Sequence, residues 1–333
     1  MVRVQLPQFV IILFSQHPYR KVGVLLYTQY VDKIVYKLQN IVLVFNLVVK
    51  LLIFIGVWVR FPEDQFIRQG FSQFIKYELW KVIIVNSFIS WIGGKKLLRS
   101  RILQEFPEPG TFDRYIEVFG GAAWLLFARD KHAKMEVYND VNGQLVNLFR
   151  VVKYHPEALQ TELDWILMSR EQFFDAIQDV RGLTDIQQAA RFFIAIRESF
   201  GAGCRSFAVS PKDMQKAVEF LQVAADRLRR VVIEREDFEH ILKTYDRPDA
   251  LFYLDPPYYE AEKYYPDRFQ PEDHERMRAA LGRIRGRFIL SYNDCGLIRE
   301  LYRGYTIIEV DRSDNLTAKS QARRYRELII KNY

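Results

Sequence analysis

The segment Leu254-Asp-Pro-Pro-Tyr-Tyr259 carries three kinds of group that together could bind the amino group of a planar ring. Asp255 offers a carboxylate and Pro256 a backbone carbonyl, two neighbouring acceptors that suit the hydrogens of an NH₂ group. Two consecutive prolines fix φ and keep this backbone stiff and extended. Tyr258 offers a flat face on which a base could stack. The alternative is a rigid loop in which Tyr258 and Tyr259 serve only packing.

The apolar segment Leu251-Phe-Tyr-Leu254 places this motif at the end of a predicted buried strand. In open α/β sheets, ligands bind beyond the carboxyl ends of the strands. Asp255 would therefore stand where a ligand site is expected.

A second candidate site follows the predicted strand Tyr115-Ile-Glu-Val-Phe119. Gly120 and Gly121 let the backbone approach a ligand closely, and residues 122–129 read as a helix whose N-terminus would face that ligand. Asp140 ends the next predicted strand, about twenty residues later, which is the spacing of an acid that binds a ribose diol in dinucleotide folds. Asp140 could instead be only a helix N-cap.

The segment Trp91-Ile-Gly-Gly-Lys95 combines an aromatic residue, two glycines and a cation. Gly93 and Gly94 could form an ordinary loop, and Lys95 could be a solvated charge beside Lys96.

The elements that must position these motifs alternate between strand and helix from residue 85 onward. Residues 156–228 are mostly helical by pattern, with an interruption at Phe200–Phe207. The simplest architecture is an α/β fold with a parallel or mixed sheet and a helical insertion. Further strands are predicted at residues 135–138, 231–233, 288–291, 305–310 and 325–330.

The net charge of +7 is unevenly divided along the chain. Residues 1–84 carry ten Lys and Arg against four Asp and Glu, or +6, which leaves 38 against 37, or +1, for the rest. Any nucleic-acid surface after residue 84 must therefore come from local clusters. The two cysteines form no C-x-x-C pattern, so we expect no metal site, no disulfide framework and a cytoplasmic location.

Residues 1–84 differ from the remainder in composition, and three interpretations of them stay open. The apolar run at 41–59 is long enough to span a membrane, but Asn46 and Lys50 interrupt it. A second interpretation is an additional soluble module. The third, which we favour, is upstream sequence read from a misplaced start, because the codons of Trp80-Lys-Val82 permit a purine-rich ribosome-binding sequence before Val85. A chain that starts at Val85 is then expected to fold and to be active.

From about residue 85 to 333 the chain resembles the Dam-type, or alpha-class, DNA adenine N6-methyltransferases, which depend on S-adenosylmethionine. The resemblance does not extend to residues 1–84. It rests on motifs that occur in that family's order: Trp91–Lys95, Glu117–Ala123, Asn139-Asp140, Asp255–Tyr258 and Arg326–Asn332. One departure is alanine at 122 and 123, where the family often has a further glycine.

The resemblance implies a Rossmann-like methyltransferase sheet with a helical target-recognition insertion. Residues 85–150 and 236–333 would form the catalytic domain, and residues 151–235 the insertion. Double-stranded DNA would be the substrate, a monomer the working form, and GATC a recognition site by analogy alone.

The resemblance also implies a role for each matching residue. Asp255 would lie between the donor and the target base, with Pro256 and Tyr258 also in the catalytic motif, and Lys95 would pair with the donor's methionine carboxylate. Arg205 and Lys212 in the insertion would contact DNA. The remaining residues expected to bind the donor are Trp91, Phe119, Gly120, Gly121 and Asp140.

Three alternatives differ from this function. Cytosine N4 methylation often has serine in place of Asp255, and protein glutamine methylation would favour asparagine there. A DNA-binding protein that keeps the fold without catalysis is the third alternative. The presence of Asp255, Lys95 and Asp140 argues against it.

Overall fold

The computed structural model describes residues 2–6, 9–13, 86–166, 169–208, 213–262, 269–313 and 324–333. The chain divides between Ile83 and Ile84 into two compact units. In the first unit, β1 (Val2–Leu6) pairs antiparallel with β2 (Phe9–Leu13). The apolar run at 41–59 and Val85 lie outside the described residues. Among the residues described, no helix is both long and apolar enough to cross a membrane.

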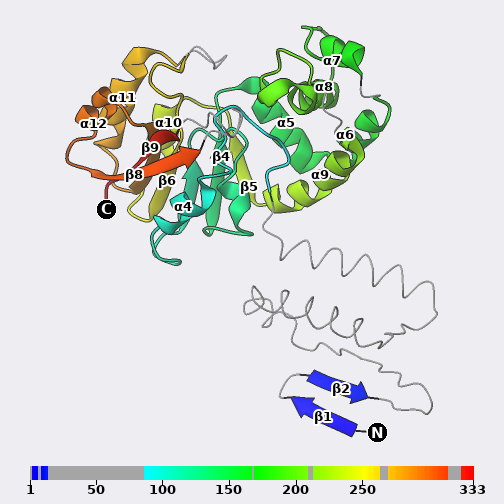
Figure 1. Ribbon diagram of the computed structural model, residues 1–333, viewed down its shortest axis with the longest axis horizontal. Coiled ribbons are helices and arrows are strands. Elements are labelled where there is room, and N and C mark those ends of the chain that lie inside the picture. The colour runs from blue at the N-terminus through cyan, green and yellow to red at the C-terminus, as the bar shows by residue number, and fades with distance from the viewer. Residues whose placement is uncertain are drawn as a thin grey trace. The chain divides into compact units, whose positions relative to one another are not determined.

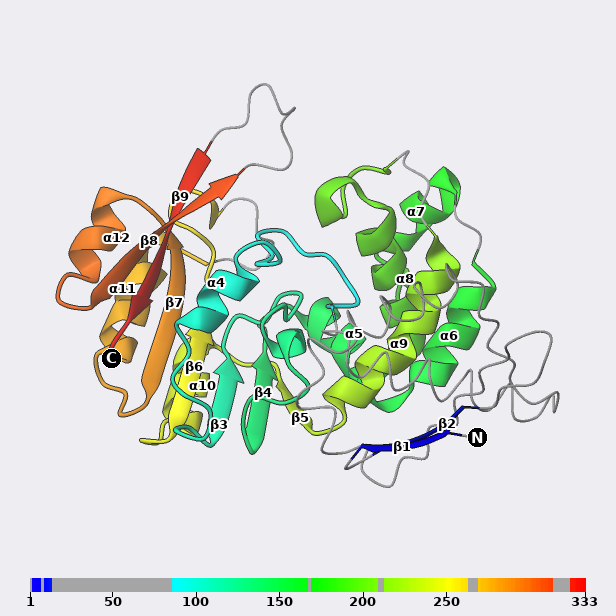
Figure 2. The same ribbon diagram turned by 60° about the horizontal axis from the view of Figure 1, so that its bottom comes forward.

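The second unit is built on a seven-stranded sheet of order β5-β4-β3-β6-β7-β9-β8. Each predicted strand is present within three residues of its expected bounds. The strands are β3 (Arg114–Glu117), β4 (Met135–Asn139), β5 (Val231–Glu234), β6 (Ala250–Leu254), β7 (Arg287–Asn293), β8 (Thr306–Ser313) and β9 (Arg324–Lys331). Figure 2 shows β4, β3, β6 and β7 side by side.

The strand order reverses between β3 and β6. From β3 the chain builds outward through β4 and β5, then crosses to the other side of β3 to form β6 and β7, all in parallel. β9 enters antiparallel between β7 and β8 and closes that edge as a hairpin. Such a reversal point opens a crevice at the carboxyl ends of the strands, so the Rossmann-like α/β class expected from the sequence is confirmed.

The helices fall into two groups along the chain (Figure 1). The first lies between β4 and β5, where one crossover helix would suffice, and the second lies near β6, β7 and β8. The first group is α5 (Gly143–Tyr154), α6 (Pro156–Asp164), α7 (Arg170–Ala176), α8 (Asp185–Glu198) and α9 (Met214–Leu228); the second is α10 (Phe238–Tyr245), α11 (Pro271–Leu281) and α12 (Gly296–Leu301), while α4 (Arg99–Gln104) precedes β3.

Alternate residues of the strands face two separate cores. On β6, Leu251 and Tyr253 belong to the core that contains α5, α8 and α9, whereas Phe252 and Leu254 belong to the core that contains α10, α11 and α12. The same alternation holds on β7 and β9. Because side chains of a strand alternate between faces, this pattern defines a three-layer α/β arrangement.

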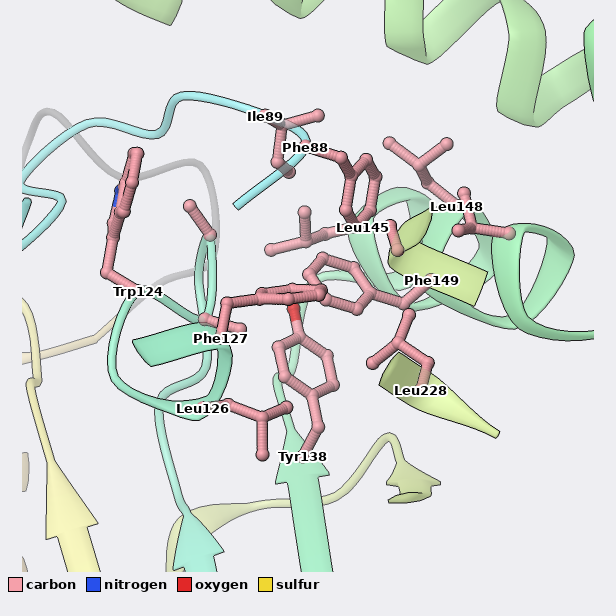
Figure 3. Packing of buried hydrophobic residues seen from close by; sticks show 14 of the residues in the cluster. Phe88, Ile89, Trp124, Leu126, Phe127, Tyr138, Leu145, Leu148, Phe149 and Leu228 are labelled. Atoms are coloured by element: carbon pink, nitrogen blue, oxygen red, sulfur yellow. The ribbon is translucent and has the colours of Figure 1, made fainter. Parts of the chain in front are cut away.

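The helices of the predicted insertion share the first core with the sheet. The Tyr138 ring of β4 stacks on Phe149 of α5, with centroids 4.0 Å apart and planes 12° apart. Figure 3 shows two residues around this stacked pair: Phe127, from the segment after β3, and Leu228, the last residue of α9. Residue 151, where the insertion was expected to begin, lies inside α5. Packing therefore continues from the sheet into the helices without a break.

A buried ion pair also joins α9 to the sheet. Arg227 donates through Nη1 and Nη2 to the two carboxylate oxygens of Glu136 on β4, at 2.9 and 2.8 Å. The two side chains are 3% and 4% exposed. Arg227 also donates to the carbonyls of Leu126 and Arg129, so one guanidinium holds helix, strand and the segment after β3 together.

Removing one partner of this pair should destabilise the second unit strongly, because a buried charge is left uncompensated. We expect Arg227→Met to lower the free energy of unfolding by about 3–5 kcal/mol. Lys216→Met is the matched control on α9, since its ion pair with Asp213 is exposed to solvent and its loss should change the free energy of unfolding much less. Urea unfolding followed by circular dichroism measures both, and equal losses would contradict the role given to Arg227.

Candidate active site

A pocket opens at the carboxyl edge of the sheet, where the strand order reverses. Four of the five sequence motifs contribute to it, and three of these four stand at the ends of β3, β4 and β6. The lining residues are Trp91, Ile92, Gly94, Lys95, Glu117, Phe119, Gly120, Gly121, Ala122, Trp124, Leu125, Asp140, Val141, Tyr253, Asp255, Pro257 and Phe269. Every residue expected to bind the donor therefore lines one cavity.

An ion pair between Lys95 and Asp255 crosses this pocket. Lys95 Nζ lies 2.7 Å from Asp255 Oδ1 and donates to the Gly93 carbonyl at 2.9 Å. The lysine is 4% exposed and the aspartate 17%. Nζ also lies 4.7 Å from the centroid of the Tyr258 ring, a cation–π distance. Lys95 is thus a buried partner of the catalytic motif, and its interpretation as a solvated charge was wrong.

The Asp-Pro-Pro-Tyr segment follows β6 directly and forms no helix or strand. Pro256 and Pro257 are buried, while Asp255 and Tyr258 are partly exposed. Of these four residues, Asp255 and Pro257 line the pocket, and Tyr258 lies beside it, next to Lys95. The Tyr258 hydroxyl donates to Glu327 Oε2 on β9 at 2.6 Å. One end of the tyrosine is therefore fixed to the sheet.

The Gly120-Gly121 turn is held from two sides. The Tyr138 hydroxyl donates to the Gly121 carbonyl at 2.8 Å, and the Gly121 amide donates to Asp140 Oδ2 at 2.9 Å. A Cβ atom on Gly120 would come within 2.2 Å of the Tyr138 ring, and Gly121 adopts φ +49°. Both positions therefore require glycine.

Asp140 binds backbone on both of its oxygens, because Oδ1 accepts from the Asn142 amide at 2.9 Å. The cap of α5 is Asn142, whose Oδ1 accepts from the Leu145 amide at 2.8 Å. The interpretation of Asp140 as the helix N-cap was therefore wrong.

The helix expected at residues 122–129 is absent from this described segment. Ala123 takes φ +55°, and only a 3-10 turn, η2 (Leu126–Ala128), follows. The Leu126 amide donates to the buried Glu117 carboxylate at 2.5 Å, so a side chain competes with the helical hydrogen bond there. No helix N-terminus therefore follows the glycines within this segment, and the prediction that one would face the ligand was wrong.

Trp91 and Phe119 form apolar walls of the pocket. A Cβ on Gly121 would lie 3.0 Å from Trp91 Cδ1, and the Trp91 ring meets Phe192 of α8 edge-on at 5.9 Å. Phe119 packs between Phe238 and Phe269, with centroids 5.7 and 5.9 Å away. These walls suit a flat or apolar part of a ligand.

From the sequence, Glu117 has no expected role beyond its place in the Glu117–Ala123 motif. In the structure it is a buried acid that lines the pocket. It is 1% exposed and accepts from the Tyr115 hydroxyl at 2.7 Å. Burial raises the pKa of Glu117 to about 8. Its burial comes from tertiary packing, which the order of residues along the chain does not display.

Arg205, which was expected to contact DNA, does not line the pocket. Arg205 is exposed in a tight loop that a bridge between Ser199 and Phe207 closes. Phe200 at the base of this loop is 67% exposed. Lys212 lies outside the described residues.

A model of the D12 class N6 adenine-specific DNA methyltransferases matches residues 91–316, more than half of the chain. The chain belongs to this family. The methyltransferase is therefore an enzyme specific for adenine in DNA, and the family disfavours the cytosine N4 alternative. Its methyl donor is S-adenosylmethionine.

Two curated relatives cover most of the methyltransferase. It is 28% identical over 281 residues to the type II methyltransferase M1.LlaDCHI of Lactococcus lactis subsp. cremoris, covering 75% of this chain and 96% of the relative. It is 26% identical over 291 residues to the type II methyltransferase M.MjaIII of Methanocaldococcus jannaschii, covering 75% and 99%.

Among solved structures, the rRNA methyltransferase aviRa of Streptomyces viridochromogenes is 13% identical to this chain, with a TM-score of 0.34, covering 71% of this chain and 84% of that one. The fold assignment rests on the strand order, not on this low similarity.

The residues of the pocket fit the donor. The Gly120 and Gly121 turn leaves room that a Cβ would fill, an acid stands beside it at Asp140, and a buried ammonium lies at Lys95. A nucleoside joined to an amino acid carries a ribose diol and a carboxylate, which match the acid and the ammonium. No group of three or more His, Cys, Asp and Glu able to hold a metal occurs in the described part of the chain.

The raised pKa of Glu117 predicts a pH-dependent contribution to stability. The folded protein binds this proton more tightly than the unfolded chain, so the contribution is greatest below about pH 4.5 and is lost as pH rises towards 8. Relative to the wild type, Glu117→Gln should gain about 1 kcal/mol of unfolding free energy per pH unit across that interval. Urea unfolding between pH 5.5 and 8.5 measures the difference, and parallel curves for the two proteins would contradict it.

Proposed function

We propose that this methyltransferase acts on an adenine flipped out of double-stranded DNA, which Asp255, Pro256 and Tyr258 hold for methylation at N6. The observation that carries the proposal is the Lys95–Asp255 ion pair, which lies at the reversal point of the sheet with the Tyr258 ring beside it. A base inside a duplex cannot reach a pocket at a sheet edge, so it must leave the stack.

Asp255 and Pro256 would activate the amino nitrogen. The lone pair of adenine N6 is delocalised into the ring, which makes it a poor nucleophile. Hydrogen bonds from the two amino hydrogens to the Asp255 carboxylate and the Pro256 carbonyl concentrate charge on N6 as the N–C bond forms. S-adenosylmethionine supplies a methyl group on a sulfonium, whose C–S electron pair passes to sulfur. N6 then gives up one of its two protons.

Lys95 and Asp140 keep capacity for the donor in spite of their partners. An ammonium has three donors, and in the described part of the chain Lys95 directs two towards Asp255 and Gly93. The third is available for the donor's methionine carboxylate. Both oxygens of Asp140 accept backbone amides. A carboxylate can accept about four hydrogen bonds, so Asp140 would also accept from the ribose hydroxyls. Trp91, Phe119, Gly120 and Gly121 would enclose the rest of the donor.

The helices at 151–235 would read the DNA sequence, while residues 85–150 and 236–333 carry out the chemistry. Arg205 and Phe200 are both exposed in the same loop, and a cation and a flat ring are groups that suit phosphate and base contacts. Lys212 remains a proposed DNA contact. We further infer a monomer in the cytoplasm.

Loss of the Asp255 carboxylate should abolish methyl transfer. We expect Asp255→Ala to lower kcat by at least about a hundredfold, because the variant loses an acceptor aligned with the reacting nitrogen. Transfer of labelled methyl groups from S-adenosylmethionine to varied duplexes measures this.

Asp164→Ala is the control, since Asp164 is exposed at the end of α6 and should leave transfer unchanged. Equal transfer by Asp255→Ala and the wild type, or transfer by neither, would contradict the proposal.

A further inference from the structure

Glu327 is a buried acid beside the site to which the reaction assigns no role. It lies on β9 and is 3% exposed. Its Oε2 accepts from the Tyr258 hydroxyl at 2.6 Å, although the two residues are 69 positions apart in sequence. Burial, together with Asp255 and Glu327, raises the pKa of Tyr258 well above its usual value, so the phenol keeps its proton and remains the donor.

The residue paired with Glu327 on the neighbouring strand also contacts the segment after β6. Glu327 pairs directly with Asn293 across β7 and β9, and Asn293 Nδ2 donates to the Tyr259 carbonyl at 3.2 Å. The paired residues Asn293 and Glu327 thus hold both tyrosines. Glu327 binds the Tyr258 hydroxyl, and Asn293 binds the Tyr259 backbone carbonyl. The hairpin that closes the sheet therefore bears directly on the segment after β6.

The geometry restricts the Tyr258 ring. Its Cβ is fixed by the buried prolines before it, and its hydroxyl is fixed by Glu327, so rotation of the ring away from the pocket would break a hydrogen bond to a carboxylate. Stacking of a base on this ring would be more favourable than stacking on a mobile ring, because no side-chain entropy is lost when the base binds.

We propose that Glu327 is a positioning residue that orients Tyr258 as the stacking surface for the extruded adenine. This inference rests on the proposed base flipping. It assigns to β9 a part in the reaction in addition to its part in the fold.

The full chain tests this with four variants and a duplex that carries fluorescent 2-aminopurine at the target base. Tyr258→Ala extrudes the base with no ring to stack on, and it should give the brightest emission. Glu327→Ala and Tyr258→Phe should each be brighter than the wild type and lower kcat about tenfold, because each removes the same hydrogen bond. The double variant, Glu327→Ala with Tyr258→Phe, should have a kcat no lower than that of either single variant. The dissociation constant for S-adenosylmethionine should stay within about twofold of the wild-type value, since neither the Glu327 carboxylate nor the Tyr258 hydroxyl is proposed to contact the donor.

Two substitutions separate positioning from general damage. Glu327→Gln keeps an oxygen acceptor for Tyr258, so kcat should stay within about threefold of the wild type. Glu309→Ala, on the neighbouring strand β8, removes an acid that is 52% exposed and should change neither kcat nor emission.

The proposal is overturned if Glu327→Ala matches the wild type, if Glu327→Gln loses as much as Glu327→Ala, or if the two losses add in the double variant. If Glu327→Ala does not fold, unchanged kcat and emission in Tyr258→Phe overturn it. Failure of base flipping is distinct, because Tyr258→Ala would then give no emission above the free duplex.

Discussion

The ion pair between Lys95 and Asp255 is the interaction on which the rest of the site depends. Its members come from segments 160 positions apart, one before the first strand of the sheet and one after β6. Because both side chains are largely buried, each would be costly to keep charged without the other. The pair therefore fixes the Trp91–Lys95 turn against the Asp-Pro-Pro-Tyr segment.

The pocket lies at the carboxyl edge of the sheet, and the surrounding helices hold this edge in place. The reversal of strand order at β3 and β6 brings the ends of three strands to one crevice. Arg227 anchors α9 to β4 and to the carbonyls after β3, so the helices expected to read DNA are joined to the wall of the donor pocket. The helices between β4 and β5 and the wall of the pocket thus share one core.

Much of the fold and of the pocket could be predicted from the sequence. The apolar strands are short, β-branched or aromatic, and bounded by turns, so their positions were predictable to within three residues. The motifs that meet in the pocket could be found in the sequence because their residue types are chemically constrained. Their convergence in one cavity follows from the parallel topology.

The remaining features depend on contacts between distant segments. Residues 122–128 have good helix-forming composition, yet the Glu117 carboxylate takes the Leu126 amide and Ala123 adopts a left-handed conformation. The partners of Lys95, Tyr258 and Asp140 could not be predicted either, because spacing along the chain gives no pairing across the sheet. Glu117 and Glu327 gain their importance only from where the fold buries them.

Identification of the methylated nucleoside tests the central claim most directly. Duplex DNA treated with the wild-type enzyme and S-adenosylmethionine would be digested to nucleosides and analysed by mass spectrometry. The account predicts N6-methyladenine as the product. N4-methylcytosine, or no methylated nucleoside from an enzyme that binds both substrates, would contradict it.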